Sequence, residues 1–219
     1  VEEYQKWDSE RKLREEDRSQ EAILPLQRAV QESEEPSAHI HYLLGECNLK
    51  QRPEPDFGRA LAHYKEAKRI AQSDQLQRSE LPKYVKKLAE YYRYARGGLA
   101  EAAAEARQLI ELEPEDDSHR RMLAGICARA SQEATAPAEQ SQYMEQALDA
   151  ARKAVEVGPD NVENYQLLAG LILRRDEPDA LDRAEALISD AVTKVEDKEA
   201  AHLFLAQIHL RRAAGAGED

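Results

Sequence analysis

Apolar and small residues recur along this chain at intervals of three and four, the spacing that places side chains on one face of an α-helix. The clearest example is the run "YQLLAGLIL", residues 165–173, in which Tyr165, Leu168, Ala169 and Ile172 stand at i, i+3, i+4 and i+7. A β-strand would need alternation with a period of two. A membrane segment would need roughly 20 apolar residues. The run therefore predicts a buried helix.

The same stripe recurs in four other places. It appears as His41, Leu44, Gly45 and Asn48, as Val85, Leu88, Ala89 and Tyr92, as Arg120, Leu123, Ala124 and Cys127, and as His202, Leu205, Ala206 and His209. A second pattern follows the first four of these five stripes, with a small residue, a second residue four positions on that is larger in two of the copies, and a small or apolar one three further. Its copies are Ala60, Tyr64 and Ala67, then Ala102, Ala106 and Leu109, then Ala147, Ala151 and Ala154, then Ala184, Ile188 and Ala191. Turn signals such as "LEPEDD" and "VGPDN" separate the units, so the repeating unit is predicted to be a helical hairpin.

These paired motifs resemble the tetratricopeptide repeat, whose first helix carries Leu with Ala or Gly and whose second helix carries the small-large-small pattern. Pro114 and Pro159 stand where that repeat commonly closes. The units here exceed the family's 34 residues at residues 51–55 and 175–178, and residues 131–143 add more, either as extra helical turns or as a loop. The Sel1-like repeats are a weaker alternative, because their loop glycines are mostly missing.

The resemblance implies an all-α, right-handed α-solenoid of about five antiparallel helix pairs and a C-terminal capping helix. We expect a single domain over residues 1–213, followed by a disordered tail at 214–219. The expected pairs span 1–36, 37–73, 80–115, 117–160 and 162–197, and the expected capping helix spans 198–213.

In such a stack the first helices line a concave groove, and the resemblance places the partner-binding positions on them. Lys or Arg recurs near the last turn of each first helix, which predicts a basic stripe that receives an acidic or carboxylate-bearing peptide. The alternative is that these cations only complement the helix macrodipole. The candidate residues are Tyr42, Glu46, Lys50, Lys86, Glu90, Arg93, Arg121, Arg129, Gln166, Arg174, Gln207 and Arg211.

Charge and composition narrow the function further. The formal net charge is −12 and the pI is about 5.1, which argues against nucleic-acid and anionic-membrane surfaces. No apolar run is long enough for membrane insertion, and the start "VEEYQKWDSE" does not resemble a secretory leader. We therefore expect a soluble chain in the cytoplasm rather than a secreted one. Cys47 and Cys127 lie in apolar helical patterns and are expected to pack as small hydrophobes.

Candidate chemistry is sparse. His41, His202 and His209 fall on the predicted packing stripes, and no Glu or Asp is found at metal-binding spacing from any histidine, so we expect neither a catalytic residue, a metal nor a cofactor. The leading hypothesis is a non-catalytic scaffold for protein–protein interaction that binds a peptide or partner subunit in its groove. The alternative is a regulatory or assembly region of a larger multidomain protein, including self-association. The sequence leaves the oligomeric state open.

Overall fold

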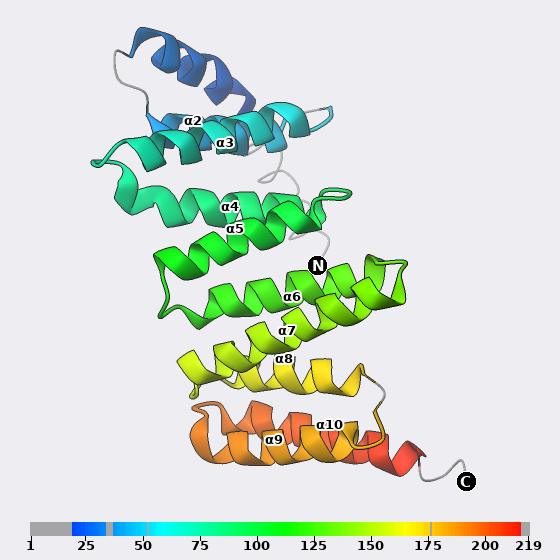
Figure 1. The fold of residues 1–219 in the computed structure, drawn as a ribbon. Helices are drawn as coiled ribbons and strands as arrows, with labels where there is room; N and C mark the ends of the chain where they lie inside the picture. The colour runs from blue at the N-terminus through cyan, green and yellow to red at the C-terminus, as the bar shows by residue number, and fades with distance from the viewer. Residues whose placement is uncertain (1–18, 34–36, 52, 176, 216–219) are drawn as a thin grey trace, which may run out of the picture. The chain divides into compact units, whose positions relative to one another are not determined.

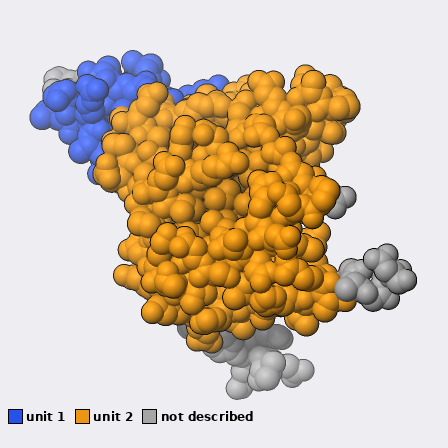
Figure 2. Space-filling view, turned by 60° about the horizontal axis from the view of Figure 1, so that its bottom comes forward, with its two compact units in different colours: residues 1–91 blue, residues 92–219 orange. Residues whose placement is uncertain are grey.

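A computed structural model describes residues 19–33, 37–51, 53–175 and 177–215. The regular structure of these residues is helical throughout, and no strand occurs among them (Figure 1). The chain divides into two compact units, residues 1–91 and residues 92–219, which are coloured separately in Figure 2. The first predicted helix, upstream of residue 19, lies outside the described residues.

The first unit contains a helix over residues 19–32, α2 (Ala38–Leu49), α3 (Phe57–Ser73), the short 3₁₀ helix η1 (Arg78–Glu80) and most of α4 (Leu81–Tyr94). Ser37 and Asp56 cap α2 and α3, because their side-chain oxygens accept bonds from the N–H groups of Ile40 and Arg59. Such caps satisfy backbone donors that have no partner within the helix.

The second unit contains the last residues of α4, then α5 (Leu99–Leu112), α6 (Asp117–Glu133), α7 (Pro137–Val157), α8 (Val162–Leu173), α9 (Ala180–Lys194) and α10 (Lys198–Gly215). Each helix from α5 to α10 packs against the next one along the chain (Figure 1). Asp116 and Asn161 cap α6 and α8, and Arg212 of α10 pairs with Asp182 and Glu185 of α9. The prediction of an all-α chain whose helices pack in consecutive pairs is thus confirmed.

Alanine governs the spacing between paired helices. All twelve residues of the four small-large-small copies are buried, including Tyr64 at 1% exposure. Four residues of the stripe that predicted α8, namely Tyr165, Leu168, Ala169 and Ile172, are buried as well. Gly45 shows why one position must be small, because a Cβ there would lie 2.4 Å from Cε1 of Tyr64.

The extra residues at 131–143 lengthen both helices of their pair. α6 continues to Glu133 and α7 begins at Pro137 and runs for 21 residues, so the connection between them is short. The Ser131 hydroxyl donates to the carbonyl of Gln140 over 2.7 Å, and the Gln140 amide donates to the carbonyl of Ala134 over 2.8 Å. The extension therefore consists of helical turns and not of a protruding loop.

The predicted packing stripe of α10 is wrong by one residue. Ala201 and Ile208 are buried, whereas His202, Ala206 and His209 are exposed. Ala201 and Ile208 are seven apart, and the half-buried Phe204 and Leu205 between them pack against the same core. This register buries an aromatic and two aliphatic side chains and leaves the imidazoles in water, which avoids their desolvation.

Candidate partner-binding surface

In the first unit, Glu46 is part of the packing between helices. Its carboxylate accepts a 2.6 Å hydrogen bond from the Tyr64 hydroxyl and pairs with the Lys87 ammonium, also at 2.6 Å. Burial of the ring, and next the bond to Glu46, raise the pKa of Tyr64 far above its ordinary value. Glu46 thereby connects α2, α3 and α4, so its carboxylate is engaged inside the fold.

Tyr42 lies in an aromatic cluster next to this network. Its ring centre is 6.0 Å from that of Tyr64 and 5.7 Å from that of Tyr84, and the Lys83 ammonium lies 4.7 Å from it. Tyr42 is half-buried as a result, but three other candidates of this unit are exposed. These are Lys50, Lys86 and Glu90.

Arg121, in the second unit, is also engaged inside the fold. Its guanidinium donates to Asp117 over 2.6 Å and to the buried Asn164 over 2.9 Å, and it lies 3.1 Å from Glu163. The Asn164 amide in turn donates to Asp117 and to the carbonyls of Ala154 and Gly158. The network joins α6 to α8 and to the end of α7, so the Arg121 guanidinium is bonded within the fold.

Arg129 bonds to the end of α4. It donates to the carbonyl of Arg93 over 2.8 Å and pairs with Glu133 at 2.7 Å, while the Arg93 guanidinium lies 5.8 Å from the ring centre of Tyr94. Because α6 runs on to Glu133, Arg129 is not in its last turn, and Arg211 precedes the end of α10 at Gly215. The last-turn assignment was therefore wrong for these two arginines, and the macrodipole does not explain them.

The remaining candidates lie on α8 and α10, which pack against each other. Gln166 is half-buried and donates to the carbonyl of Ala200 over 3.4 Å. Arg174 is the C-cap residue of α8 and is exposed, and Gln207 and Arg211 of α10 are exposed as well. Arg174, Gln207 and Arg211 form what we call the α8–α10 polar set.

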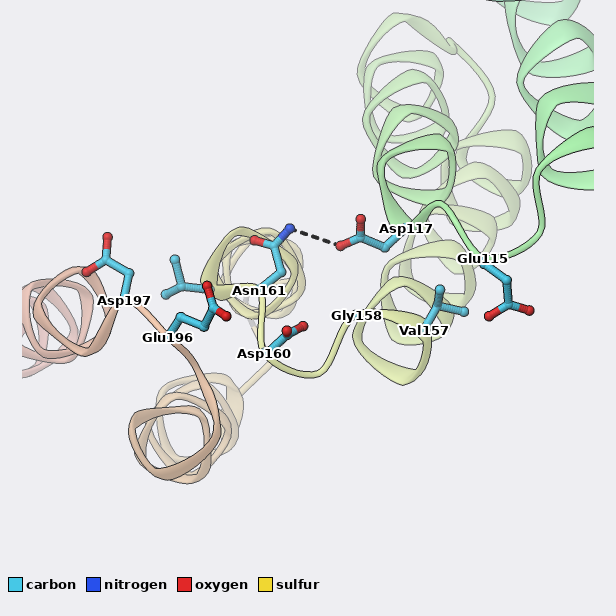
Figure 3. Close-up of a pocket in the computed structure, with 9 residues that line it drawn as sticks. Glu115, Asp117, Val157, Gly158, Asp160, Asn161, Glu196 and Asp197 are labelled. Carbon is cyan, nitrogen blue, oxygen red and sulfur yellow. Dashed lines mark hydrogen bonds between the residues drawn. The ribbon is translucent and has the colours of Figure 1, made fainter.

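An acidic pocket lies at the turns that join α5 to α6, α7 to α8 and α9 to α10 (Figure 3). Asp117 is held there by the Asn161 amide at 3.0 Å, and the Glu196 N–H donates to the Asp160 carbonyl over 3.0 Å. The sequence predicts the turns "LEPEDD" and "VGPDN" separately, because nothing local indicates that they meet each other and the turn at Glu196 and Asp197. The lining residues are Glu115, Asp117, Val157, Gly158, Asp160, Asn161, Val162, Glu196 and Asp197.

The expectation that no acid stands at metal-binding spacing from a histidine is wrong for one group, which consists of Glu113, Asp116 and His119. Their ligand atoms lie within 4.8 Å of one another, and Nε2 of His119 is 2.7 Å from Glu113 and 3.5 Å from Asp116. A metal-bound histidine usually donates its second ring N–H to a carboxylate or carbonyl. Nδ1 of His119 is buried and has no such partner among the described residues. A hydrogen bond that closes the α5–α6 turn explains this group better than a metal does.

The two cysteines pack as the sequence predicts. Both are free thiols, with Cys127 buried and Cys47 half-buried. Burial raises the pKa of each thiol above its ordinary value. Neither residue therefore has the thiolate character of a reactive cysteine.

Solved structures share this arrangement of helices over most of their length. A thermophilic TPR protein of Thermus thermophilus, TTC0263, is 19% identical with a TM-score of 0.50, over 80% of this chain and 83% of its own. BtubC from P. vanneervenii is 18% identical with a TM-score of 0.52, over 93% and 84%. A double mutant of MamA RS-1 is 16% identical with a TM-score of 0.52, over 86% and 90%. The chain has the tetratricopeptide-repeat fold.

Within the tetratricopeptide-repeat fold, α8 and α10 carry the α8–α10 polar set.

No family model matches the sequence, and no curated protein matches it either. Since the structural relatives are less than 20% identical to the chain, they establish the fold alone. Among the described residues, every helix is too short or too polar to span a membrane.

Proposed function

We propose that this chain is a non-catalytic scaffold that binds a segment of a partner protein through its first helices. The observation that carries the proposal is the tetratricopeptide-repeat fold over most of the chain, because this fold generally serves protein interaction. Exposed polar residues on α8 and α10 support it, since packing does not require them.

The α8–α10 polar set favours a carboxylate-bearing segment. Among the described residues, the side chains of Arg174 and Arg211 form no ion pair, and both are exposed. A free guanidinium offers a planar fork of donors that fits a carboxylate, and charge-assisted bonds of this kind are about twice as strong as neutral ones. Arg121 and Arg129 are left out of the proposal because both guanidiniums already bond to other residues of the chain.

A titration tests the assignment. Fluorescent peptides rich in Glu and Asp are added to the wild-type chain, to an Arg174→Glu, Arg211→Glu double variant and to Arg152→Glu. Arg152 is the matched control, since it is an exposed arginine on α7, a second helix. Binding should be lost in the double variant and retained in the control. Equal binding by all three proteins refutes a role for the polar set.

Self-association is a second candidate, favoured by one observation on α10. Leu203 and Leu210 are 59% and 70% exposed and lie seven residues apart on the same face of the helix. A second copy, or the rest of a larger assembly, could cover this pair. Sedimentation velocity of wild type and of a Leu203→Ser, Leu210→Ser variant tests this, and a wild-type chain that stays monomeric up to high micromolar concentration excludes self-association there.

A further inference from the structure

Two histidines meet head to head between α2 and α3 in the first unit. Nδ1 of His41 lies 3.1 Å from Nδ1 of His63, with the ring centres 5.3 Å apart and the ring planes tilted by 41°. The two helices are held at a fixed separation, because Gly45, one turn after His41, packs against the ring of Tyr64. The backbone therefore presents both imidazoles to each other.

Both rings are suited to act as neutral ligands. Burial is the largest cause that lowers the pKa of His41 and of His63 below the ordinary value of 6.5, and the charge of His41 lowers that of His63 further. Only one proton fits between the two Nδ1 atoms, so one ring donates and the other accepts. A cation that takes the place of this proton meets two lone pairs.

The spacing of the nitrogens is close to that of two imidazoles on one metal ion. Nitrogens bound at about 2.0–2.1 Å to a tetrahedral zinc ion lie about 3.3–3.4 Å apart, with the ring centres about 5.2 Å apart. The nitrogens would have to separate by only about 0.3 Å from their present position. Two half-buried side chains can accommodate such a shift by small changes of their χ angles.

The charges around the pair are compatible with a cation. Glu66 lies three residues after His63 on the same face of α3, and its charge raises the pKa of His41. Arg69 lowers the pKa of His41 and Arg59 lowers that of His63, but each arginine is paired with an acid. Arg69 donates to both oxygens of Glu66, and Arg59 lies 3.4 Å from Asp56.

We propose that His41 and His63 bind a divalent transition-metal ion of the zinc class through their Nδ1 atoms, with solvent as the further ligands. The ion would bridge α2 and α3, in place of the hydrogen bond between the two rings. Imidazole nitrogen favours zinc, nickel and copper over magnesium and calcium, which prefer oxygen. His41 and His63 belong to the first unit, and neither of them is a member of the α8–α10 polar set.

Calorimetric titration of the full chain with Zn²⁺ and with Ni²⁺, in a buffer that does not chelate metal, tests the proposal. Wild type should bind one ion per chain, and His41→Gln and His63→Gln should each lower the affinity more than about tenfold, since even loss of an outer-shell partner costs about 10–100-fold. Two matched controls should bind like wild type. His202→Gln removes an exposed histidine of α10, and Glu113→Gln disables the group around His119.

Circular dichroism without metal checks that each variant is folded. Co²⁺ then supplies a second measurement, because its visible absorption should change on binding to wild type and stay unchanged with His41→Gln. Two results overturn the proposal. One is metal binding that is lost in Glu113→Gln and kept in His41→Gln, and the other is wild-type binding no tighter than that of His41→Gln.

Discussion

Replacement of Gly45 by alanine is a sharp test of how α2 and α3 pack. The new Cβ would lie 2.4, 2.7 and 2.9 Å from Cε1, Cδ1 and Cζ of the Tyr64 ring. Carbon atoms in contact lie about 3.5–4.0 Å apart, so the ring would have to move by about 1 Å or more. Tyr64 is 1% exposed and its hydroxyl is bonded to Glu46, which leaves the ring no free direction.

The expected cost follows from three terms. Overpacking of a filled site costs about 1–3 kcal/mol. Loss of the Tyr64–Glu46 bond, which involves a charged acceptor, costs about 1.5–3 kcal/mol if the ring moves out of reach. Alanine regains about 1 kcal/mol of helix propensity relative to glycine. The Gly45→Ala substitution should therefore destabilise the chain by about 1.5–5 kcal/mol.

Urea unfolding followed by circular dichroism measures this change, with Gly170→Ala as the matched control. Gly170 lies within α8 with no heavy atom within 4 Å of the added Cβ. Its replacement should be neutral or stabilise by up to about 1 kcal/mol. In a Tyr64→Leu background the cost of Gly45→Ala should shrink, because the clashing ring is gone. A Gly45→Ala chain as stable as wild type refutes the packing described for this pair.

The remaining predictions concern the polar network, the histidine pair and the thiols. Arg121→Met should destabilise the chain by about 2–3 kcal/mol, because it leaves Asp117 and the buried Asn164 without this donor. The urea midpoint measures this loss, and an unchanged midpoint contradicts a structural role for Arg121. Burial lowers the pKa of His41 and His63 below 6.5, so the unfolded chain takes up protons on these rings at a higher pH than the folded chain. The free energy of unfolding should therefore be largest above about pH 6.5 and fall as the pH drops through the folded pKa values. In a His41→Gln, His63→Gln double variant the urea midpoint should fall less between pH 7 and pH 5 than in wild type. An equal fall in both proteins is the opposing result. A thiol reagent should modify the half-buried Cys47 before the buried Cys127, as mass spectrometry of Cys→Ser variants can show, and faster labelling of Cys127 contradicts its burial.

The sequence predicted the alanine-lined core because a buried face needs only local periodicity. Ala147, Ala151 and Ala154 are apolar, small and correctly spaced, and no distant residue changes that interpretation. The register of α10 was missed because His202, Leu205, Ala206 and His209 also stand at i, i+3, i+4 and i+7. Two stripes one residue apart were available, and the cost of burying imidazole decided between them.

The candidate site could be predicted only in part, since it depends on contacts between distant residues. Arg121 is engaged by Asn164, 43 residues away, and Arg129 by the carbonyl of Arg93, 36 residues away. His41 and His63 meet across a hairpin from positions that carry no common motif. Spacing identifies which helix a side chain stands on, whereas the partner on the facing helix decides whether that side chain is free to bind.

Hydrogen–deuterium exchange with and without a bound acidic peptide tests the scaffold proposal most directly. At saturating peptide, the account predicts slower exchange in α8 and α10, the helices of Arg174, Gln207 and Arg211. Exchange in α7 and α9 should stay unchanged. Slower exchange confined to α7 and α9, or no change anywhere at saturation, would contradict the account.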